Sequence, residues 1–502
     1  MKDNNVRAPL LGPQGSMHLN QDSSRSGSGC DDDDCDRGTG VLFRLRQIEA
    51  NLNKRFGVES EAIERKLPED RRKVKWHEEL SMALLWASAT MNTSCFATGF
   101  LGWELGLSLK QTIIISILAS IVGGALPGFA ATFGAAHGST PDLRFPVQIG
   151  WSAVACITGG LALTAVADGH LSLIVGIVIL AIVAMLISFV GLRAILIYER
   201  YAWVIFFAIF LIFFGETGRY ADNTTPSQVK GANLAGSILS LIAIVYGSSA
   251  SWVSIAADYY VHYPADVSRV KVFLMTTFGI AIPTSIGMVA GCVVASALNN
   301  MPGWANIYET EGIGFLVQSV LYPRGFAKVI LTLLVLSGIN VNVVSIYSSA
   351  IAFQQLAHPF AQVPRFIWTL FSFLLILALA LGGREQLNAF LQNFLSLLGY
   401  WSTSYFVVLF AEHYVFRKGR FENYDLEAWD DPTRLPVGLA ALAAFLVGVV
   451  GWVLGMVETW YAGPVGKLIG TNGGDLGNEL TFIATLVTYI PARYLELKVF
   501  RK

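Results

Sequence analysis

Charged residues are scarce in this chain. Asp, Glu, Lys and Arg make up 14% of its 502 residues, whereas a typical soluble domain has about 25%. The mean hydropathy of +0.53 is correspondingly high. A formal net charge of −1 gives no electrostatic basis for binding nucleic acid, and five cysteines are too few for a disulfide framework in a chain this long. These scarcities exclude an ordinary soluble enzyme and a secreted disulfide scaffold.

The apolar residues are concentrated after the first 77 positions. Residues 1–77 are polar and rich in Gly, Ser and Asp, so they predict a disordered, cytoplasmic N-terminal tail. Cys30 and Cys35 flank an Asp run in this tail; they could form a weak metal site, but a solvated acidic segment is the favoured interpretation. Apolar runs begin near Leu80, too late for a cleaved signal peptide.

The apolar runs that follow have the length of membrane spans, which need about 20 residues each. They predict an all-α polytopic membrane protein with about twelve transmembrane helices. The expected spans are 80–103, 110–136, 145–167, 171–191, 200–216, 235–256, 271–298, 326–354, 364–382, 388–415, 436–458 and 479–497.

Basic residues set the expected orientation. With the tail inside, the inner segments from residue 65 onward hold 20 Lys and Arg residues and the outer segments hold 7, as the positive-inside rule requires. Both termini are therefore predicted to be cytoplasmic. Asn223-Thr224-Thr225 is a glycosylation sequon in an expected outer loop, which makes Asn223 a candidate glycosylation site.

Two spans contain polar interruptions at matched positions. Span 1 is interrupted at 88–94 and span 6 at 247–254, and both stretches are rich in Ser and other small residues. Broken helices in corresponding positions of two halves are typical of transporters, where they form the substrate site. Small residues that merely allow close helix packing are the alternative, and the matched positions favour the broken helices.

Other polar residues lie inside spans 3 and 8. Asn342, Ser345 and Ser349 share one face of span 8, and a polar stripe in a span must face protein or a cavity. Trp151 and Trp252 could stack on a flat ring, although either could be an ordinary core or interfacial aromatic residue.

Few charges lie within the spans, and no catalytic or metal-binding constellation is visible. The chain is therefore not expected to be an enzyme or to hold a metal or other cofactor. Asp258, at the end of span 6, is the best candidate for coupling or gating, with Arg269 as its partner; a structural cap at the end of span 6 is the alternative.

The sequence resembles the fungal purine–cytosine permeases, which belong to nucleobase–cation symporter family 1. The resemblance covers almost all of residues 50–500. It is carried by the span 6 segment 251–264, and by Gly150-Trp151-Ser152, Tyr347-Ser348, Gly399-Tyr400-Trp401, Glu412-His413, Glu427-Ala428-Trp429, Trp460-Tyr461, Gly473-Gly474-Asp475 and Arg493-Tyr494-Leu495-Glu496.

The resemblance implies a leucine-transporter-like fold with two inverted five-helix repeats and two extra helices. The corresponding segments are 78–236 and 235–415 for the repeats, 416–435 for a cytoplasmic loop, and 436–502 for spans 11 and 12 with a short C-terminus. The resemblance also implies proton-coupled import of a nucleobase across the plasma membrane, with the substrate between spans 1, 3, 6 and 8. The candidate substrate-binding residues are Ser88, Thr90, Trp151, Ser152, Trp252, Asn342 and Ser345.

The chain departs from the family pattern in the expected site. Span 1 has Thr90 where the family usually has Asn, and span 3 has Ala155 where an amide side chain is common. In span 8 the family reads approximately Asn-Asn-Ile-Pro-Asn before the Tyr-Ser pair, and the stretch 341–345 retains Asn342 but has Val341, Val344 and Ser345 in place of an Asn, the Pro and a second Asn. Because a site built to hydrogen-bond a polar substrate rejects analogues strongly, these changes indicate an altered substrate.

Three interpretations therefore stay open beside a nucleobase symporter. The substrate could be another flat nitrogen heterocycle, such as a vitamin B6 form, an allantoin-like compound or a secondary metabolite. The chain could also be a non-transporting nutrient sensor on a transporter scaffold. A membrane enzyme is the weakest alternative, because no catalytic constellation accompanies the spans.

Overall fold

The computed structural model describes residues 69, 71, 76–137, 145–190, 193–261, 263–355, 358–428, 431 and 433–500. Nearly all of the expected tail, including Cys30 and Cys35, lies outside these residues. The described part is helical, and an isolated β-bridge joins Val457 and Ala462.

The helices follow the expected spans closely. Span 1 is split into α2 (Trp76–Thr90), α3 (Thr93–Thr98) and α4 (Leu101–Glu104), and span 6 into α9 (Ala232–Ala250) and two 3₁₀ segments, η4 (Ser251–Ser254) and η5 (Ala256–Tyr260). The other spans are α5 (Leu109–His137), α6 (Phe145–Val166), α7 (Leu173–Val190), α8 (Arg193–Thr217), α10 (Arg269–Ala297), α13 (Arg324–Gln355), α15 (Arg365–Gly383), α16 (Leu387–Ala411), α17 (Leu439–Gly455) and α18 (Gly477–Phe500).

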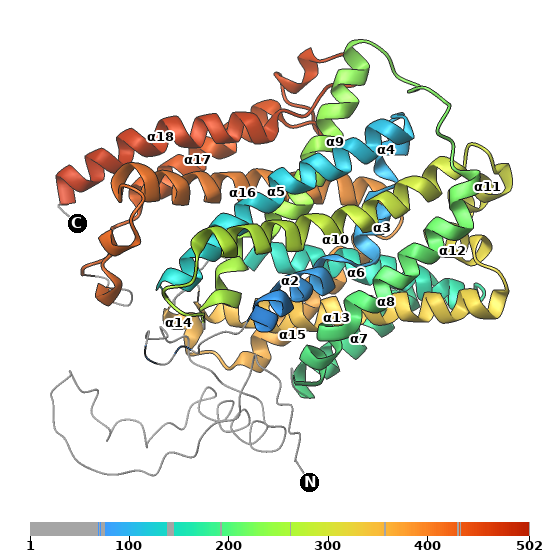
Figure 1. Ribbon diagram of the computed structural model, residues 1–502, viewed down its shortest axis with the longest axis horizontal. Helices are drawn as coiled ribbons and strands as arrows, with labels where there is room; N and C mark the ends of the chain where they lie inside the picture. Colours follow the sequence, from blue (N-terminus) through green and yellow to red (C-terminus); the bar gives the residue numbers. More distant parts are fainter. Residues whose placement is uncertain are drawn as a thin grey trace, which may run out of the picture.

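Short helices join the spans at both ends of the bundle. The connection between α10 and α13, which lies outside the expected spans, folds into α11 (Pro302–Glu311) and α12 (Ile313–Val320). The short helix α14 (His358–Ala361) lies at the opposite end, between α13 and α15. We refer to these as the α11 end and the α14 end of the bundle (Figure 1).

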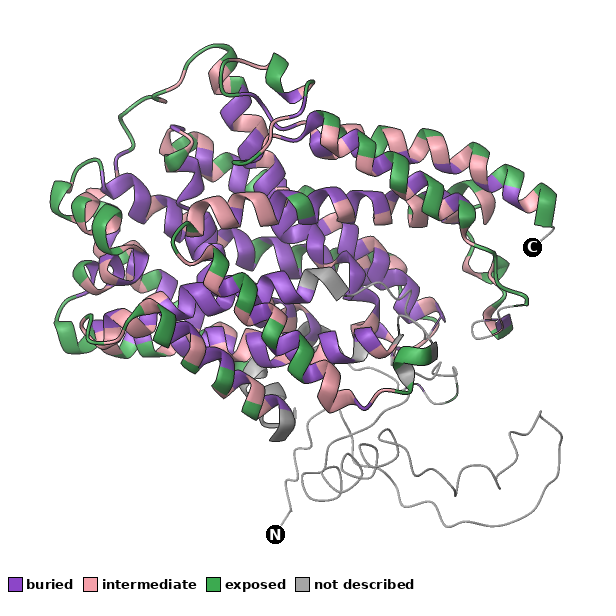
Figure 2. Cartoon of the chain, turned by 180° about the vertical axis from the view of Figure 1, so that it is seen from behind, coloured by how far each residue is buried: buried purple, intermediate pink, exposed green. Residues whose placement is uncertain are grey.

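Most of the long helices can cross a bilayer. Within the described residues, eight helices are long and apolar enough to do so by length and composition, and two shorter apolar helices cover 173–188 and 439–455. The exposed large side chains of α17 include Leu442, Leu446 and Val450, each about one turn from the next. Such an exposed apolar stripe is what a lipid-facing helix carries. Figure 2 shows the burial concentrated in the centre of the bundle and the exposure at its edges.

The spans pack in two groups. One consists of α2, α5, α9 and α10, and the other of α6, α7, α13 and α15. Each group thus combines two spans from the first five with the two at corresponding positions among the next five. Helix α16 packs against α9 and α18, and α17 and α18 pair along one edge of the bundle (Figure 1). The interrupted spans 1 and 6 both belong to the first group.

Close approach between helix backbones depends on glycine at key positions. A Cβ atom on Gly247 of α9 would lie 1.9 Å from the carbonyl oxygen of Leu395 in α16, and one on Gly134 of α5 would lie 1.9 Å from the carbonyl oxygen of Ala257 in η5. No larger residue fits at these positions without moving a backbone. The interrupted span 6 is therefore in close backbone contact with α16 through α9 and with α5 through η5.

Candidate functional site

The break in span 1 is organised by one side chain. Asn92 lies between α2 and α3 with an extended backbone, and its Oδ1 accepts hydrogen bonds from the backbone N–H groups of Ser94 (2.9 Å) and Cys95 (3.2 Å). Its Nδ2 donates to the carbonyl oxygen of Ala89 at 3.1 Å. Asn92 therefore satisfies backbone groups of both half-helices, which would otherwise be left unpaired inside a membrane protein. The interruption predicted at 88–94 is confirmed.

The break in span 6 takes a different form. Helix α9 ends at Ala250 and the chain tightens into 3₁₀ turns from Ser251 to Tyr260, instead of unwinding into extended backbone. A 3₁₀ stretch inside a helix commonly marks a functional hinge or a strained sequence. The interruption predicted at 247–254 is therefore confirmed, although it begins four residues after Gly247.

Trp151 of α6 reaches the break in span 6. Its indole Nε1 donates a hydrogen bond to Oγ of Ser251 at 3.2 Å, and the hydroxyl of Ser251 donates in turn to the carbonyl oxygen of Ser248 at 3.0 Å. The ring of Trp151 also contacts Phe394 of α16 edge to face, with centroids 5.7 Å apart and planes at 87°. Spans 3, 6 and 10 therefore meet around this one tryptophan.

Trp252 follows Ser251 directly and packs toward span 1. Its ring lies edge to face against Trp86 of α2, with centroids 5.9 Å apart, and Trp86 also contacts Tyr259 at 4.7 Å. Trp252 is only partly buried, whereas Trp86 is fully buried. The structure thus brings the two predicted aromatic walls to the same break, each supported by a different aromatic neighbour.

The predicted residues of span 1 make contacts within the protein. The hydroxyl of Ser88 accepts a hydrogen bond from the backbone N–H of Trp203 in α8 at 3.1 Å, and the hydroxyl of Thr90 donates to the carbonyl oxygen of Trp86 at 2.9 Å. Ser152, beside Trp151, is completely buried and its hydroxyl has no hydrogen-bond partner among the described residues. Of these three hydroxyls, that of Ser152 has its hydrogen-bonding capacity unused.

The polar residues of span 8 lie against span 3. Asn342 is fully buried, its Nδ2 donates to the carbonyl oxygen of Gly338 at 2.8 Å, and its Oδ1 accepts from Sγ of Cys156 at 3.4 Å. Ser345 donates to Oε1 of Gln148 at 3.1 Å. These pairs join α6 to α13. Both ends of the Asn342 carboxamide are therefore hydrogen-bonded within the protein, one inside α13 and the other to α6.

Asp258 and Arg269 lie on either side of the turn that follows span 6. Asp258 is a partly buried residue of η5. Arg269, at the start of α10, donates from Nη2 to the carbonyl oxygen of Ala265 at 2.6 Å and lies over the ring of Phe421, 5.1 Å from its centroid. The contacts described for Arg269 are thus with Ala265 and Phe421, and the predicted pairing with Asp258 remains a prediction.

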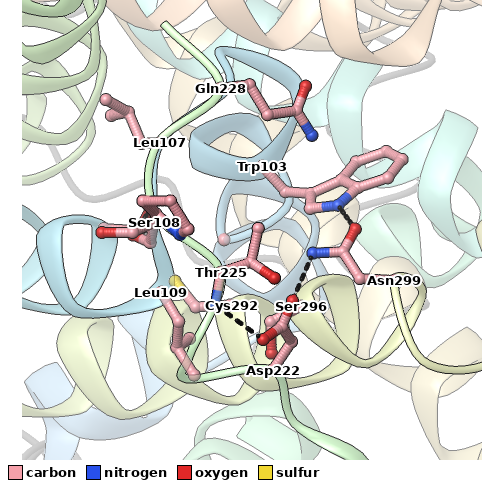
Figure 3. A pocket seen from close by; sticks show the side chains of 13 residues that line it. Trp103, Leu107, Ser108, Leu109, Asp222, Thr225, Gln228, Cys292, Ser296 and Asn299 are labelled. Carbon is pink, nitrogen blue, oxygen red and sulfur yellow. Dashed lines mark hydrogen bonds between the residues drawn. The ribbon is translucent and has the colours of Figure 1, made fainter. Parts of the chain in front are cut away.

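A small cavity lies at the α11 end, beside α4 at the end of span 1 (Figure 3). Asp222 anchors it: one carboxylate oxygen accepts from the backbone N–H groups of Thr224 and Thr225, and the other accepts from Asn299, which itself accepts from Trp103. Hydrogen bonding by the side chain of Thr225, together with the backbone N–H groups and Asn299, holds the pKa of Asp222 well below its ordinary value, although burial acts in the opposite direction. The cavity volume of about 20 Å³ fits a single water molecule and no organic substrate.

Sequence reasoning missed part of this site. Ser251 and Asn92 lie in the predicted interruptions but were not singled out, although Asn three residues before Cys95 is a readable helix-cap signal. Phe394 gives no signal in the sequence, because only the packing of α16 on α6 brings it to Trp151.

The arrangement suits recognition and offers no group for covalent chemistry. It presents aromatic planes and hydroxyls at the meeting point of two broken helices. The described residues contain no group of three His, Cys, Asp or Glu side chains that could hold a metal ion. Two broken helices at corresponding positions of a polytopic bundle are typical of secondary membrane transporters, and this is the class that the fold supports.

Comparison with known proteins gives the family. Residues 66–471 match the family described as permease for cytosine/purines, uracil, thiamine, allantoin, and the chain belongs to this family. It is 32% identical over 445 residues to the purine-cytosine permease FCY2 of Saccharomyces cerevisiae, covering 84% of this chain and 83% of that protein. It is 31% identical over 482 residues to the purine-cytosine permease fcyB of Emericella nidulans, covering 92% and 93%.

Two further comparisons concern substrate and fold. The vitamin B6 transporter TPN1 of Saccharomyces cerevisiae is 28% identical over 531 residues, covering 92% of each chain. The nucleobase-cation-symport-1 family transporter Mhp1, in its inward facing conformation, superposes with a TM-score of 0.58 at 16% identity, covering 88% of this chain and 96% of that one. A Na⁺-coupled sialic acid symporter superposes with a TM-score of 0.52 at 12% identity, covering 90% and 97%. The predicted transporter fold is therefore confirmed.

Proposed function

We propose that this protein imports a nucleobase such as cytosine or a purine across the plasma membrane, coupled to protons. One observation carries the proposal. Trp151 of span 3 donates a hydrogen bond to Ser251 in the break of span 6, and Ser251 directly precedes Trp252. Two tryptophans at a helix break provide aromatic surfaces on which the flat ring of a substrate can stack. The purine-cytosine permeases among the relatives support the nucleobase.

The coupling ion and the orientation belong to the same proposal. We assign the α14 end and both termini to the cytoplasm, on the basis of the 20:7 distribution of basic residues. In this orientation Asn223, which is exposed beside the small cavity, faces outward and can carry a glycan. Asp258 is proposed as the coupling or gating carboxylate, and 78–236 and 235–415 as the inverted repeats.

A second candidate substrate is a different flat nitrogen heterocycle, of the vitamin B6 type. The observation that favours it is the position of Asn342, whose carboxamide is already hydrogen-bonded to Gly338 of its own helix and to Cys156 of α6. Ala155 and Thr90 also lack amide groups. Next to Trp151, the hydroxyl of Ser152 has no hydrogen-bond partner among the described residues, and the relative TPN1 is named a vitamin B6 transporter.

Uptake tests the proposal. The chain is expressed in yeast that lacks its own nucleobase permeases, and uptake of labelled cytosine, adenine, hypoxanthine and pyridoxine is measured at acid and at neutral pH. We expect saturable uptake that is faster at acid pH and is lost with an uncoupler. Pyridoxine uptake without nucleobase uptake would select the second candidate. Binding without accumulation, with the protein at the cell surface, would favour a sensor.

A further inference from the structure

Ser251 is placed where it can control the orientation of Trp151. It is the first residue after α9, its side chain is completely buried, and its hydroxyl accepts the indole N–H of Trp151 at 3.2 Å. The hydroxyl proton of Ser251 is donated to the carbonyl oxygen of Ser248. The lone pairs of Oγ therefore remain available to accept from another donor. A buried indole N–H needs an acceptor, and Ser251 supplies it.

The opposite side of Trp151 is confined by packing. Phe394 meets the indole ring edge to face, and it also fills the space beside Gly150, where a Cβ atom would lie 1.9 Å from Cε2 of Phe394. The ring of Trp151 is thus held at one edge by a hydrogen bond and at another by an aromatic contact. Free rotation of the indole is incompatible with both.

The hydrogen bond connects the aromatic wall to the state of the helix break. Ser251 has its position because α9 changes to 3₁₀ geometry at this residue. A rearrangement of the break moves the Ser251 oxygen, and with it the acceptor of Trp151. The wall is therefore complete only while span 6 is broken in the observed way.

We propose that Ser251 is a positioning residue for substrate binding, which fixes the ring of Trp151 for stacking on a flat heterocycle. This inference rests on the proposed function for the identity of the substrate. The orientation of Trp151 by Ser251 can be tested without any substrate.

The kinetic test compares Ser251→Ala with Ser249→Ala. Ser249 is a matched control, since it is also completely buried, two residues earlier in the last turn of α9, and its hydroxyl has no hydrogen-bond partner among the described residues. For uptake of adenine, cytosine or pyridoxine, whichever the wild type transports, we expect Ser251→Ala to raise KM about 2- to 10-fold, the effect of one hydrogen bond. Vmax should change little, and Ser249→Ala should leave both constants unchanged. An unchanged KM in Ser251→Ala overturns the proposal.

A double mutant separates this bond from a general packing defect. Trp151→Phe removes the indole N–H, so adding Ser251→Ala to it should have no further effect on KM. A further increase of the size seen in the wild-type background would show that Ser251 acts through another contact and would overturn the proposal.

A spectroscopic test is independent of transport. The purified protein is labelled with fluorotryptophan, and the ¹⁹F resonance of Trp151 among the twelve tryptophans is assigned by its loss in Trp151→Phe. Ser251→Ala should shift this resonance, and Ser249→Ala should not. A resonance that stays in place in Ser251→Ala overturns the positioning role, even if the wild type transports none of the substrates tested. Failure of uptake with a shifted resonance counts against the proposed function alone.

Discussion

At the scale of single residues, the site depends on small side chains that leave room for large ones. Gly150 lies next to Trp151, and the absence of its side chain makes space for the ring of Phe394. Trp151, in turn, is in contact with the break in span 6. Gly150 thus determines which aromatic groups can meet at Trp151.

We therefore expect Gly150→Ala to damage the site. The new methyl group would overlap Phe394, and overpacking of this kind costs about 1–3 kcal/mol. Thermal unfolding of the purified protein should show a lower midpoint, and KM for the transported heterocycle should rise. Gly215→Ala is the control, because a Cβ atom there meets nothing within 4 Å. Equal behaviour of the two variants would contradict the packing described for Phe394.

Asn92 is the second residue with a defined role. It caps α3 and also bonds back to α2, and loss of a helix cap costs about 0.5–2 kcal/mol. Asn92→Ala should lower the thermal midpoint by more than Asn92→Asp, because Asp keeps the acceptor for the two backbone N–H groups. The midpoints of the two purified variants provide the comparison. An Asp variant no more stable than the Ala variant would refute the capping role.

At the scale of elements, the connection between α17 and α18 is fixed by a buried pair of carboxyl groups. Glu458 and Asp475 both lie in this connection, beyond the end of α17, and both contact the hydroxyl of Tyr400 in α16. Asp475 also accepts from the backbone N–H groups of Val457 and Gly477. A tyrosine has one proton to donate. If it goes to Asp475, the 3.0 Å contact with Glu458 requires a proton on Glu458.

The protonation of this pair makes stability depend on pH. Burial, together with the charge of Asp475, raises the pKa of Glu458 well above its ordinary value, and burial raises the pKa of Asp475 to about 6. Glu479 also faces Asp475 and contributes to the increase. Neither Glu458 nor Asp475 forms an ion pair in the described part of the chain. At pH values between the ordinary pKa of these carboxyl groups and their raised pKa in the folded protein, the folded state therefore binds more protons than the unfolded state.

We expect the free energy of unfolding to fall as pH rises above the ordinary carboxyl range of about 4, up to about pH 6 for Asp475 and further for Glu458. The stabilisation is complete below the ordinary carboxyl pKa and is lost as each group ionises, by up to about 1.4 kcal/mol per pH unit for each proton. Glu458→Gln imitates the protonated acid, so the decline should be shallower in this variant. Glu311→Gln, an exposed substitution at the same end of the bundle, should keep the wild-type slope. Identical slopes for all three proteins, from thermal unfolding across a pH series, would rule out a protonated Glu458.

At the scale of the whole molecule, the sequence was informative about the spans and less so about their contacts. Apolar runs and polar interruptions predicted the long helices and both breaks, because the bilayer imposes a length and excludes unpaired backbone. Helices α11 and α12 were missed, since they are short and lie in a connection outside the predicted spans. Span 11 was expected to reach Glu458, but α17 ends at Gly455.

The polar stripe of span 8 illustrates what the sequence could not decide. Periodicity placed Asn342, Ser345 and Ser349 on one face, and all three are buried. A polar face buried against another helix and one that lines a cavity have the same pattern in the sequence. The structure shows that Asn342 and Ser345 bond to α6. The Phe394–Trp151 contact likewise arises only when α16 packs beside α6.

The account as a whole requires that this chain alone moves a flat heterocycle with protons. The most direct measurement uses purified protein reconstituted in liposomes, with uptake of labelled adenine, cytosine or pyridoxine driven by an inward proton gradient. We predict accumulation that collapses with a proton ionophore and is abolished in Trp252→Ala, although this variant still reconstitutes. Accumulation that needs no proton gradient, or unchanged uptake kinetics in Trp252→Ala, would contradict the account.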